Sequence, residues 1–157
     1  MHQYLDDRME SLAYKGRFSP KNPKKYNGDP TNIVYRSLWE LKVMQKMDDN
    51  PDVLEWSSEE VIVPYISPID NRRHRYFPDF VAKTRQKDGS IKTFMIEVKP
   101  KKETMEPPRP KRITRKYVTE AMTWGRNSAK WAAAEKYCAE RGWEFQKITE
   151  ENLFGKE

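Results

Sequence analysis

Two acidic residues and a lysine lie on two short β-prone stretches of this 157-residue chain. Asp79 lies in YFPDFV, where the period-two alternation of a strand places it on an otherwise apolar face. Glu97 and Lys99 are two residues apart in FMIEVK and therefore project from one strand face. This arrangement is typical of a polar site that could hold a metal ion. The alternatives are a solvent-facing aspartate and a plain surface ion pair, which contributes about 0–1 kcal/mol.

A third acidic residue, Glu40, falls within an expected helix at residues 30–47. At about 100° per residue, that helix gathers its apolar side chains on one broad face, and Glu40 lies inside the same arc. That face comprises Ile33, Val34, Leu38, Leu41, Met44 and Met47. A buried carboxylate needs a partner, because burying it bare costs several kcal/mol. We therefore expect Glu40 to face either a metal ion or an arginine at the edge of the core.

A metal ion can bridge Asp79 and Glu97 only if both face the same side of a hairpin. A two-residue turn at Asp88-Gly89 would pair Asp79 with Val98 and put Glu97 on the opposite face. The site therefore requires a loop with an odd number of residues, a bulge or a distorted ladder. Gly89 suits the left-handed position of a three-residue loop, and Pro78 cannot donate to a ladder.

The elements that must carry these residues follow an α-β-β-β-α-β order, which predicts an α/β fold with a mixed central sheet flanked by helices. Residues 1–28 are expected to form a basic, partly flexible arm, and residues 29–157 a single domain. Proline and Asp-Gly signals delimit the elements within that domain. The helix at 30–47 begins at Asp29-Pro30. The elements expected after it are strands at 53–66, 75–84 and 91–99, a Pro-rich basic loop at 100–112, a helix at 114–141 interrupted near Gly125 and ended by Gly142, a strand at 143–148, and a short terminal helix starting at Thr149.

Basic residues are concentrated in a few stretches. The net charge is +6, and residues 99–116 alone hold eight basic and two acidic residues. Further basic runs lie at 15–26 and at 72–75. Such stretches, with aromatic residues between them, suit a polyanion such as DNA, although each run alone could be a solvated loop. The candidate DNA contacts are Arg72, Arg73, Arg75, Lys101, Lys102, Lys111 and Arg112.

Asn127 and Lys130 are further candidate phosphate contacts on the long helix. They are expected on the face opposite Trp131, Ala134 and Cys138, where an ordinary solvated face is the alternative.

Several classes of protein are excluded by composition. No stretch approaches the 18 or so apolar residues of a membrane span, and the acidic N-terminal segment is unlike a signal peptide. Cys138 is the single cysteine, so no internal disulfide can form. Two histidines and one cysteine cannot supply an ordinary tetrahedral zinc site. A reducing, cytoplasmic setting fits best.

Pro78-Asp79, Glu97-Val98-Lys99 and the upstream Glu40 resemble the motif of the PD-(D/E)XK nuclease superfamily. The expected element order resembles the restriction-endonuclease-like core of that superfamily. The runs YRSLWELKVM, EEVIVPYISPIDNRRHRYFPDF and IEVKPKK resemble the head-completion nucleases of tailed phages, which are related to TnsA-type endonucleases. The resemblance extends from about Lys15 to Phe154.

The resemblance implies metal-dependent hydrolysis of double-stranded DNA by an endonuclease, with exonuclease activity as an addition. Asp79, Glu97 and the Val98 carbonyl would hold Mg²⁺, for which Mn²⁺ could substitute, and Glu40 would bind a water of that ion or a second ion. Lys99 would orient or deprotonate the attacking water, or stabilise charge on the phosphorane.

The resemblance also implies partners and a location. The partners would be phage head or neck proteins, in the host cytoplasm during assembly or in the virion. The alternatives are a TnsA-like subunit of a transposition or repair complex and a non-catalytic head protein that binds DNA.

Overall fold

The computed structural model describes residues 14–154. Its elements, in chain order, are β1 (Gly16–Phe18), η1 (Pro23–Lys25), β2 (Ile33–Tyr35), α2 (Leu38–Asp49), β3 (Val53–Ser58), β4 (Val63–Ile66), β5 (Arg73–Tyr76), β6 (Phe80–Arg85), β7 (Ile91–Val98), η2 (Lys101–Thr104), α3 (Arg115–Arg141), β8 (Glu144–Ile148) and α4 (Glu150–Phe154).

The central sheet has four strands in the order β3-β6-β7-β8. The first three strands are antiparallel to one another, and β8 runs parallel to β7. A parallel neighbour requires a crossover connection, which α3 supplies between β7 and β8. With α2 preceding β3, the core reads α-β-β-β-α-β, so the predicted α/β fold with a mixed sheet is confirmed.

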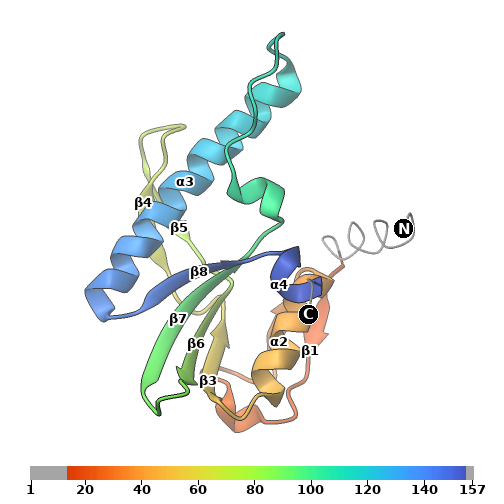
Figure 1. Ribbon diagram of the computed structural model, residues 1–157, viewed down its shortest axis with the longest axis vertical. Helices are drawn as coiled ribbons and strands as arrows, with labels where there is room; N and C mark the ends of the chain where they lie inside the picture. The colour runs from red at the N-terminus through yellow and green to blue at the C-terminus, as the bar shows by residue number, and fades with distance from the viewer. Residues whose placement is uncertain (1–13, 155–157) are drawn as a thin grey trace.

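The sheet separates two apolar layers, and neighbouring residues of β7 serve opposite faces. Ile96 packs into the cluster that contains α2, β3 and Leu153 of α4. Met95 packs into the cluster that contains α3, Phe145 of β8 and the β4–β5 hairpin. Figure 1 shows α2 and α4 on one side of the sheet, and α3 with β4 and β5 on the other. Glu97 is two residues after Met95 and therefore faces the α3 side.

The hairpin of β6 and β7 has the odd register that the site requires. Phe80 is opposite Ile96 and Arg85 is opposite Ile91. Beyond Arg85, the amide of Gln86 donates to the Ser90 carbonyl, which leaves a loop of Lys87, Asp88 and Gly89. Gly89 has φ +87°, the left-handed conformation that closes three-residue loops. A two-residue turn is therefore excluded.

The first predicted helix begins later than expected. Residues 33–35 form β2, paired with β1, and α2 begins at Leu38. Ser37 is the N-cap and accepts a hydrogen bond from the Glu40 amide, while Asp29 instead closes a local turn through Thr31. The buried face of α2 is consequently different from the predicted one and includes Trp39 and Val43 as well as Met44 and Met47.

The two predicted strands at 53–66 and 75–84 are each divided. Residue Glu59, at φ +56°, turns the chain between β3 and β4, and Phe77-Pro78-Asp79 separates β5 from β6. The separated halves β4 and β5 pair with each other as a second hairpin, which packs against α3. Pro64 lies in this two-stranded hairpin with its side chain exposed, in agreement with the edge position expected for a proline.

Residues 14–28 are part of the domain, whereas residues 1–13 lie outside the described residues. Tyr26 is buried against Trp56 in the core. The buried carboxylate of Asp48 accepts the amides of Lys21 and Asn22 at 2.7 and 3.1 Å. The prediction of a separate arm is therefore wrong for residues 14–28, because these contacts fasten them to α2.

α3 is continuous from Arg115 to Arg141, so the predicted interruption near Gly125 is absent. Gly142 ends the helix as predicted, at φ +72°, and the Trp143 amide donates to the Cys138 carbonyl. Within residues 14–154, none of the helices has the length and apolar character needed to span a bilayer.

Candidate active site

Asp79 and Glu97 meet at the end of the β6–β7 hairpin. One further step of the observed register places Asp79 opposite Glu97, so the two side chains share a face. Asp79 Oδ2 accepts the Val98 amide at 2.7 Å, while Oδ1 has no hydrogen-bond partner within residues 14–154. The break at Pro78 releases Asp79 from the ladder and allows its carboxylate to turn towards the end of β7.

Glu97 is 7% exposed and has partners on both oxygens. The buried Tyr76 hydroxyl donates to Oε1 at 2.5 Å, and Lys99 Nζ lies 3.7 Å from Oε2. Lys130 of α3 adds a second positive charge close enough to act on Glu97, and its ammonium lies over the Tyr76 ring at 5.6 Å. Tyr76 and Lys99 thus contact one buried carboxylate, and Lys130 adds a positive charge near it.

Burial and mutual repulsion disfavour the charged forms of both carboxylates. The pKa of Asp79 is raised well above its ordinary value, chiefly by burial and then by the charges of Glu97 and Glu40. Burial also raises the pKa of Glu97, although Tyr76, Lys99 and Lys130 oppose the shift. The pKa of Lys130 is lowered, mainly by burial. Closely placed carboxylates with raised pKa values are typical of sites that hold a cation.

Glu40 approaches the same site from α2. Its Oε1 accepts the Arg36 amide at 3.0 Å, which fixes the side chain at the first turn of the helix. Burial raises the pKa of Glu40, and the charges of Glu59 and Glu97 contribute. Glu40 and Lys99 line one small pocket of about 260 Å³. The Arg36 guanidinium pairs with Glu59, so the salt bridge between Glu40 and an arginine that the sequence allowed is not observed within residues 14–154. The other alternative for Glu40, a metal ion, stays a prediction.

The donor atoms fit a hard divalent cation that is held by few protein ligands. Among residues 14–154, no group of three His, Cys, Asp or Glu side chains is placed to hold a metal ion together. Mg²⁺ is commonly bound by one or two carboxylates and keeps several waters, so Asp79 and Glu97 suffice as side-chain ligands. The unpartnered Asp79 Oδ1 beside Glu97 is the observation that favours a cation here.

The candidate DNA contacts lie in several places. Arg72, Arg73 and Arg75 are exposed on and before β5, and Lys111 and Arg112 are exposed in the loop before α3. Lys101 instead pairs with Glu151 of α4 at 2.8 Å. Lys102 is exposed in η2. The remaining lysine, Lys130, is half-buried at Glu97 rather than on a solvated helix face.

The position predicted for Asn127 is wrong. Its side chain lies on the buried stripe of α3 together with Trp131, Ala134 and Cys138, because residues 127 and 131 are one turn apart on the same face. The residue itself is 7% exposed and has no hydrogen bond from its side chain within residues 14–154.

Sequence reasoning missed Tyr76 and the pair of Arg36 and Glu59. Arg36 donates twice to Glu59, at 2.9 and 3.0 Å, beside Glu40 and Asp79. The sequence Ser37-Leu38-Trp39-Glu40 matches the spacing of a capping box and could have revealed the start of α2. No local signal marks Tyr76, since its role depends on a partner 21 residues away.

Two comparisons with known proteins give matches to nucleases. The sequence model described as "TnsA-like endonuclease N terminal" matches residues 50–150, a range that contains Asp79, Glu97 and Lys99. The "Head completion nuclease" of Enterobacteria phage T4 is 40% identical over 146 residues, which cover 90% of this chain and 95% of that protein. No solved structure gives a significant match. The chain therefore belongs to the family of TnsA-like endonucleases and phage head-completion nucleases.

Proposed function

We propose that this protein is a divalent-metal-dependent endonuclease that hydrolyses phosphodiester bonds of double-stranded DNA during completion of the phage head. The observation that carries the proposal is the pairing of Asp79 and Glu97 across one hairpin, with Lys99 3.7 Å from Glu97. A pair of carboxylates beside a lysine combines ligands for a hard cation with a positive charge for phosphate.

Asp79 and Glu97 are the proposed ligands of Mg²⁺, with Mn²⁺ as a substitute and the Val98 carbonyl as a third ligand. Asp79 Oδ1 is open, and Glu97 is oriented by Tyr76. A cation bound there supplies Lewis-acid polarisation of a phosphoryl oxygen and a lowered pKa for water in its shell. Glu40 has one oxygen held by Arg36, so its other oxygen is the one available to position a water.

Lys99 is the residue proposed to contact the reacting phosphate or the attacking water. Its side chain is 27% exposed and lines the same pocket as Glu40, so it reaches both the carboxylates and solvent. Lys130 lies deeper, and its charge acts on Glu97. Through that charge, Lys130 favours the ionised carboxylate required for cation binding.

The proposed DNA path runs over exposed basic side chains. Arg72, Arg73 and Arg75 lie on and before β5, Lys102 lies in η2, and Lys111 and Arg112 lie in the loop before α3. Lys101 has a smaller expected share, because it is already paired with Glu151. Asn127 and Lys130 are proposed to contact the DNA from α3, closer to the carboxylates.

Head completion is favoured over transposition by the extent of the two similarities. The T4 protein is similar over nearly its whole length, whereas the TnsA-like model covers residues 50–150. The partners proposed for this chain are therefore phage head or neck proteins. Its proposed location is the host cytoplasm during assembly, with association with the virion to be tested by examining purified particles.

The experiment is cleavage of supercoiled plasmid with Mg²⁺, with Mn²⁺ and with EDTA. The test variant is Lys99→Ala, and the matched control is Lys92→Ala, which removes a lysine from the opposite end of the same strand. We expect metal-dependent nicking by the wild type and by Lys92→Ala, and its loss in Lys99→Ala. Metal binding is measured separately as the increase in melting temperature caused by Mg²⁺.

Two results would contradict the proposal. Cleavage by Lys99→Ala at the wild-type rate would refute the proposed active site. A folded wild-type protein that binds DNA but never cuts it, with or without metal, would favour the non-catalytic head protein.

A further inference from the structure

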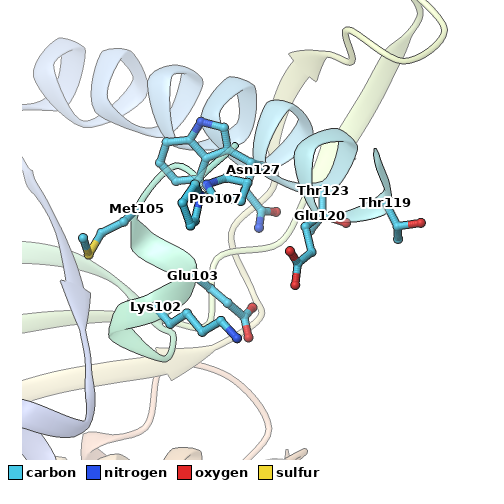
Figure 2. Close-up of a pocket in the computed structure, with 10 residues that line it drawn as sticks. Lys102, Glu103, Met105, Pro107, Thr119, Glu120, Thr123 and Asn127 are labelled. Carbon is cyan, nitrogen blue, oxygen red and sulfur yellow. The ribbon is translucent and has the colours of Figure 1, made fainter. Parts of the chain in front are cut away.

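A second pocket, of about 260 Å³, lies between α3 and the segment that follows β7. Figure 2 shows Glu120, Thr123 and Asn127 of α3 facing Lys102 and Glu103 of η2, with Met105 and Pro107 nearby on the loop. Pro108, Thr119 and Trp124 complete its lining. The lining surface is mainly apolar, and Glu103 also lines the small pocket that contains Glu40 and Lys99.

The side-chain amide of Asn127 lines the pocket and is available to a ligand. Asn127 is 7% exposed, yet its side chain makes no hydrogen bond within residues 14–154. Among residues 14–154, the fully buried side-chain atoms without a partner are the indole nitrogens of Trp39 and Trp56, so the Asn127 amide atoms keep access to the pocket. The position of this amide in the lining implies that a ligand with both donor and acceptor groups, or water, satisfies it.

The charge inside the pocket argues against a phosphate. Its charged lining residues are Lys102, Glu103 and Glu120, which give a net negative charge. The surrounding surface is basic, because Lys111, Arg112, Arg115 and Lys116 are all exposed. A DNA chain on this surface would hold its phosphates outside and could place an uncharged group inside.

We propose that this pocket holds one unpaired nucleobase of the DNA substrate, next to the site of cleavage. Trp124 and the prolines offer flat apolar surfaces for stacking, and Asn127 can hydrogen-bond to the edge of a base. The carboxylates of Glu103 and Glu120 can accept hydrogen bonds from an exocyclic amino group, which thymine lacks. This inference rests on the proposed function, since it names the form of DNA that the nuclease takes.

The position of the pocket suits a nucleotide beside the scissile phosphate. Asn127 and Lys130 are less than one helical turn apart, about 4.5 Å along α3. The Lys130 ammonium lies over the ring of Tyr76, whose hydroxyl donates to Glu97. Successive phosphates of one strand are about 3.4 Å apart along a duplex. A base at Asn127 and a phosphate at the carboxylates can therefore belong to neighbouring nucleotides. Extruding a base costs least where it is mismatched or single-stranded, so frayed or bulged DNA is the preferred substrate.

The test measures binding in EDTA, so it does not depend on catalysis. Three short duplexes are compared: one with a bulged 2-aminopurine nucleotide, one with 2-aminopurine paired to thymine, and one with a bulged abasic site. We expect the bulged base to bind at least about fivefold more tightly than the other two, which is the lower range for one base stacked on an aromatic ring. We also expect protein binding to quench the fluorescence of 2-aminopurine in the bulged duplex and to leave that of the paired duplex unchanged.

Two variants test whether the preference for a bulged base arises at this pocket. Trp124→Leu removes the stacking surface, and Glu120→Ala removes a hydrogen-bond acceptor without risk to the core. The control is Glu135→Ala, which removes an exposed acid from the same helix outside the pocket. We expect the preference for the bulged base to be lost in Trp124→Leu, reduced in Glu120→Ala and kept in Glu135→Ala. Because the Trp124 ring touches Trp131, the melting temperature of Trp124→Leu is measured to check that this variant remains folded.

Equal affinity for all three duplexes would overturn the proposal. So would a preference that survives both pocket variants, because the base would then bind elsewhere. Neither result would affect the proposed nuclease, whose failure is instead detected by the absence of metal-dependent plasmid cleavage.

Discussion

Removing the Tyr76 hydroxyl tests whether a buried hydrogen bond orients the central carboxylate. Tyr76 and Glu97 are 5% and 7% exposed, so water cannot replace the lost donor. The variant Tyr76→Phe leaves Glu97 with Lys99 at 3.7 Å and with the charge of Lys130. A hydrogen bond to a charged group contributes about 1.5–3 kcal/mol. For a chain of this length we therefore expect the free energy of unfolding to fall by about 1.5–3 kcal/mol, which corresponds to a decrease in melting temperature of roughly 3–12 °C.

The loss of stability in Tyr76→Phe should increase as the pH rises. The hydrogen bond from Tyr76 lowers the pKa of Glu97 against the larger effect of burial. Without it, the pKa of Glu97 in the folded state rises further, and the folded protein binds more protons than the unfolded chain. The free energy of unfolding of Tyr76→Phe then falls over a wider pH range above 4.5, the ordinary pKa of the group, than that of the wild type. The deficit of Tyr76→Phe should therefore be larger at about pH 8 than at about pH 4.

The assay is urea unfolding in EDTA, monitored by tryptophan fluorescence, at both pH values. Tyr65→Phe is the matched control, because Tyr65 is also buried in the second hairpin but its hydroxyl has no carboxylate partner in the described chain. If the two variants lose the same stability, or if the loss in Tyr76→Phe does not change with pH, the reasoning about Glu97 is refuted.

Three further predictions concern the site, the fold and the DNA path. Asp79→Asn should be more stable than the wild type in EDTA at about pH 8, because one of the repelling buried charges is removed. Mg²⁺ at about 100 times its Kd should stabilise only the wild type, by about 2.7 kcal/mol. Equal stabilisation of both proteins in thermal melts would argue against Asp79 as a metal ligand. Asp48→Asn should cost about 1–3 kcal/mol in urea unfolding, because one of two backbone amides loses its acceptor, and an unchanged midpoint would contradict this. Replacing Lys111 and Arg112 by glutamine should lower the slope of log affinity against log salt by about 1.8, whereas an unchanged slope in a titration would put the DNA elsewhere.

The sequence determined the chemical components of the site and the order of the core. Asp79, Glu97 and Lys99 sit on β-prone stretches whose alternation is local, and Asp88-Gly89 marks the turn between them. The sequence requires an odd register for the site, and the loop closed by Gly89 provides it in the structure. These features are accessible because strand alternation and turn chemistry depend on neighbours in the chain.

The tertiary structure decided what surrounds those residues. The strand interrupted at Pro78 lets β5 leave the central sheet, and only then does Tyr76 reach Glu97 while Asp79 reaches Val98. The depth of Asn127 on α3 likewise depends on which face packs towards the sheet and the second hairpin. Such placements follow from contacts between distant segments, whose energies are set by packing and burial rather than by local sequence. The sequence thus supplied the proposed catalytic groups, and the fold supplied their orientation, their charge balance and the pocket beside them.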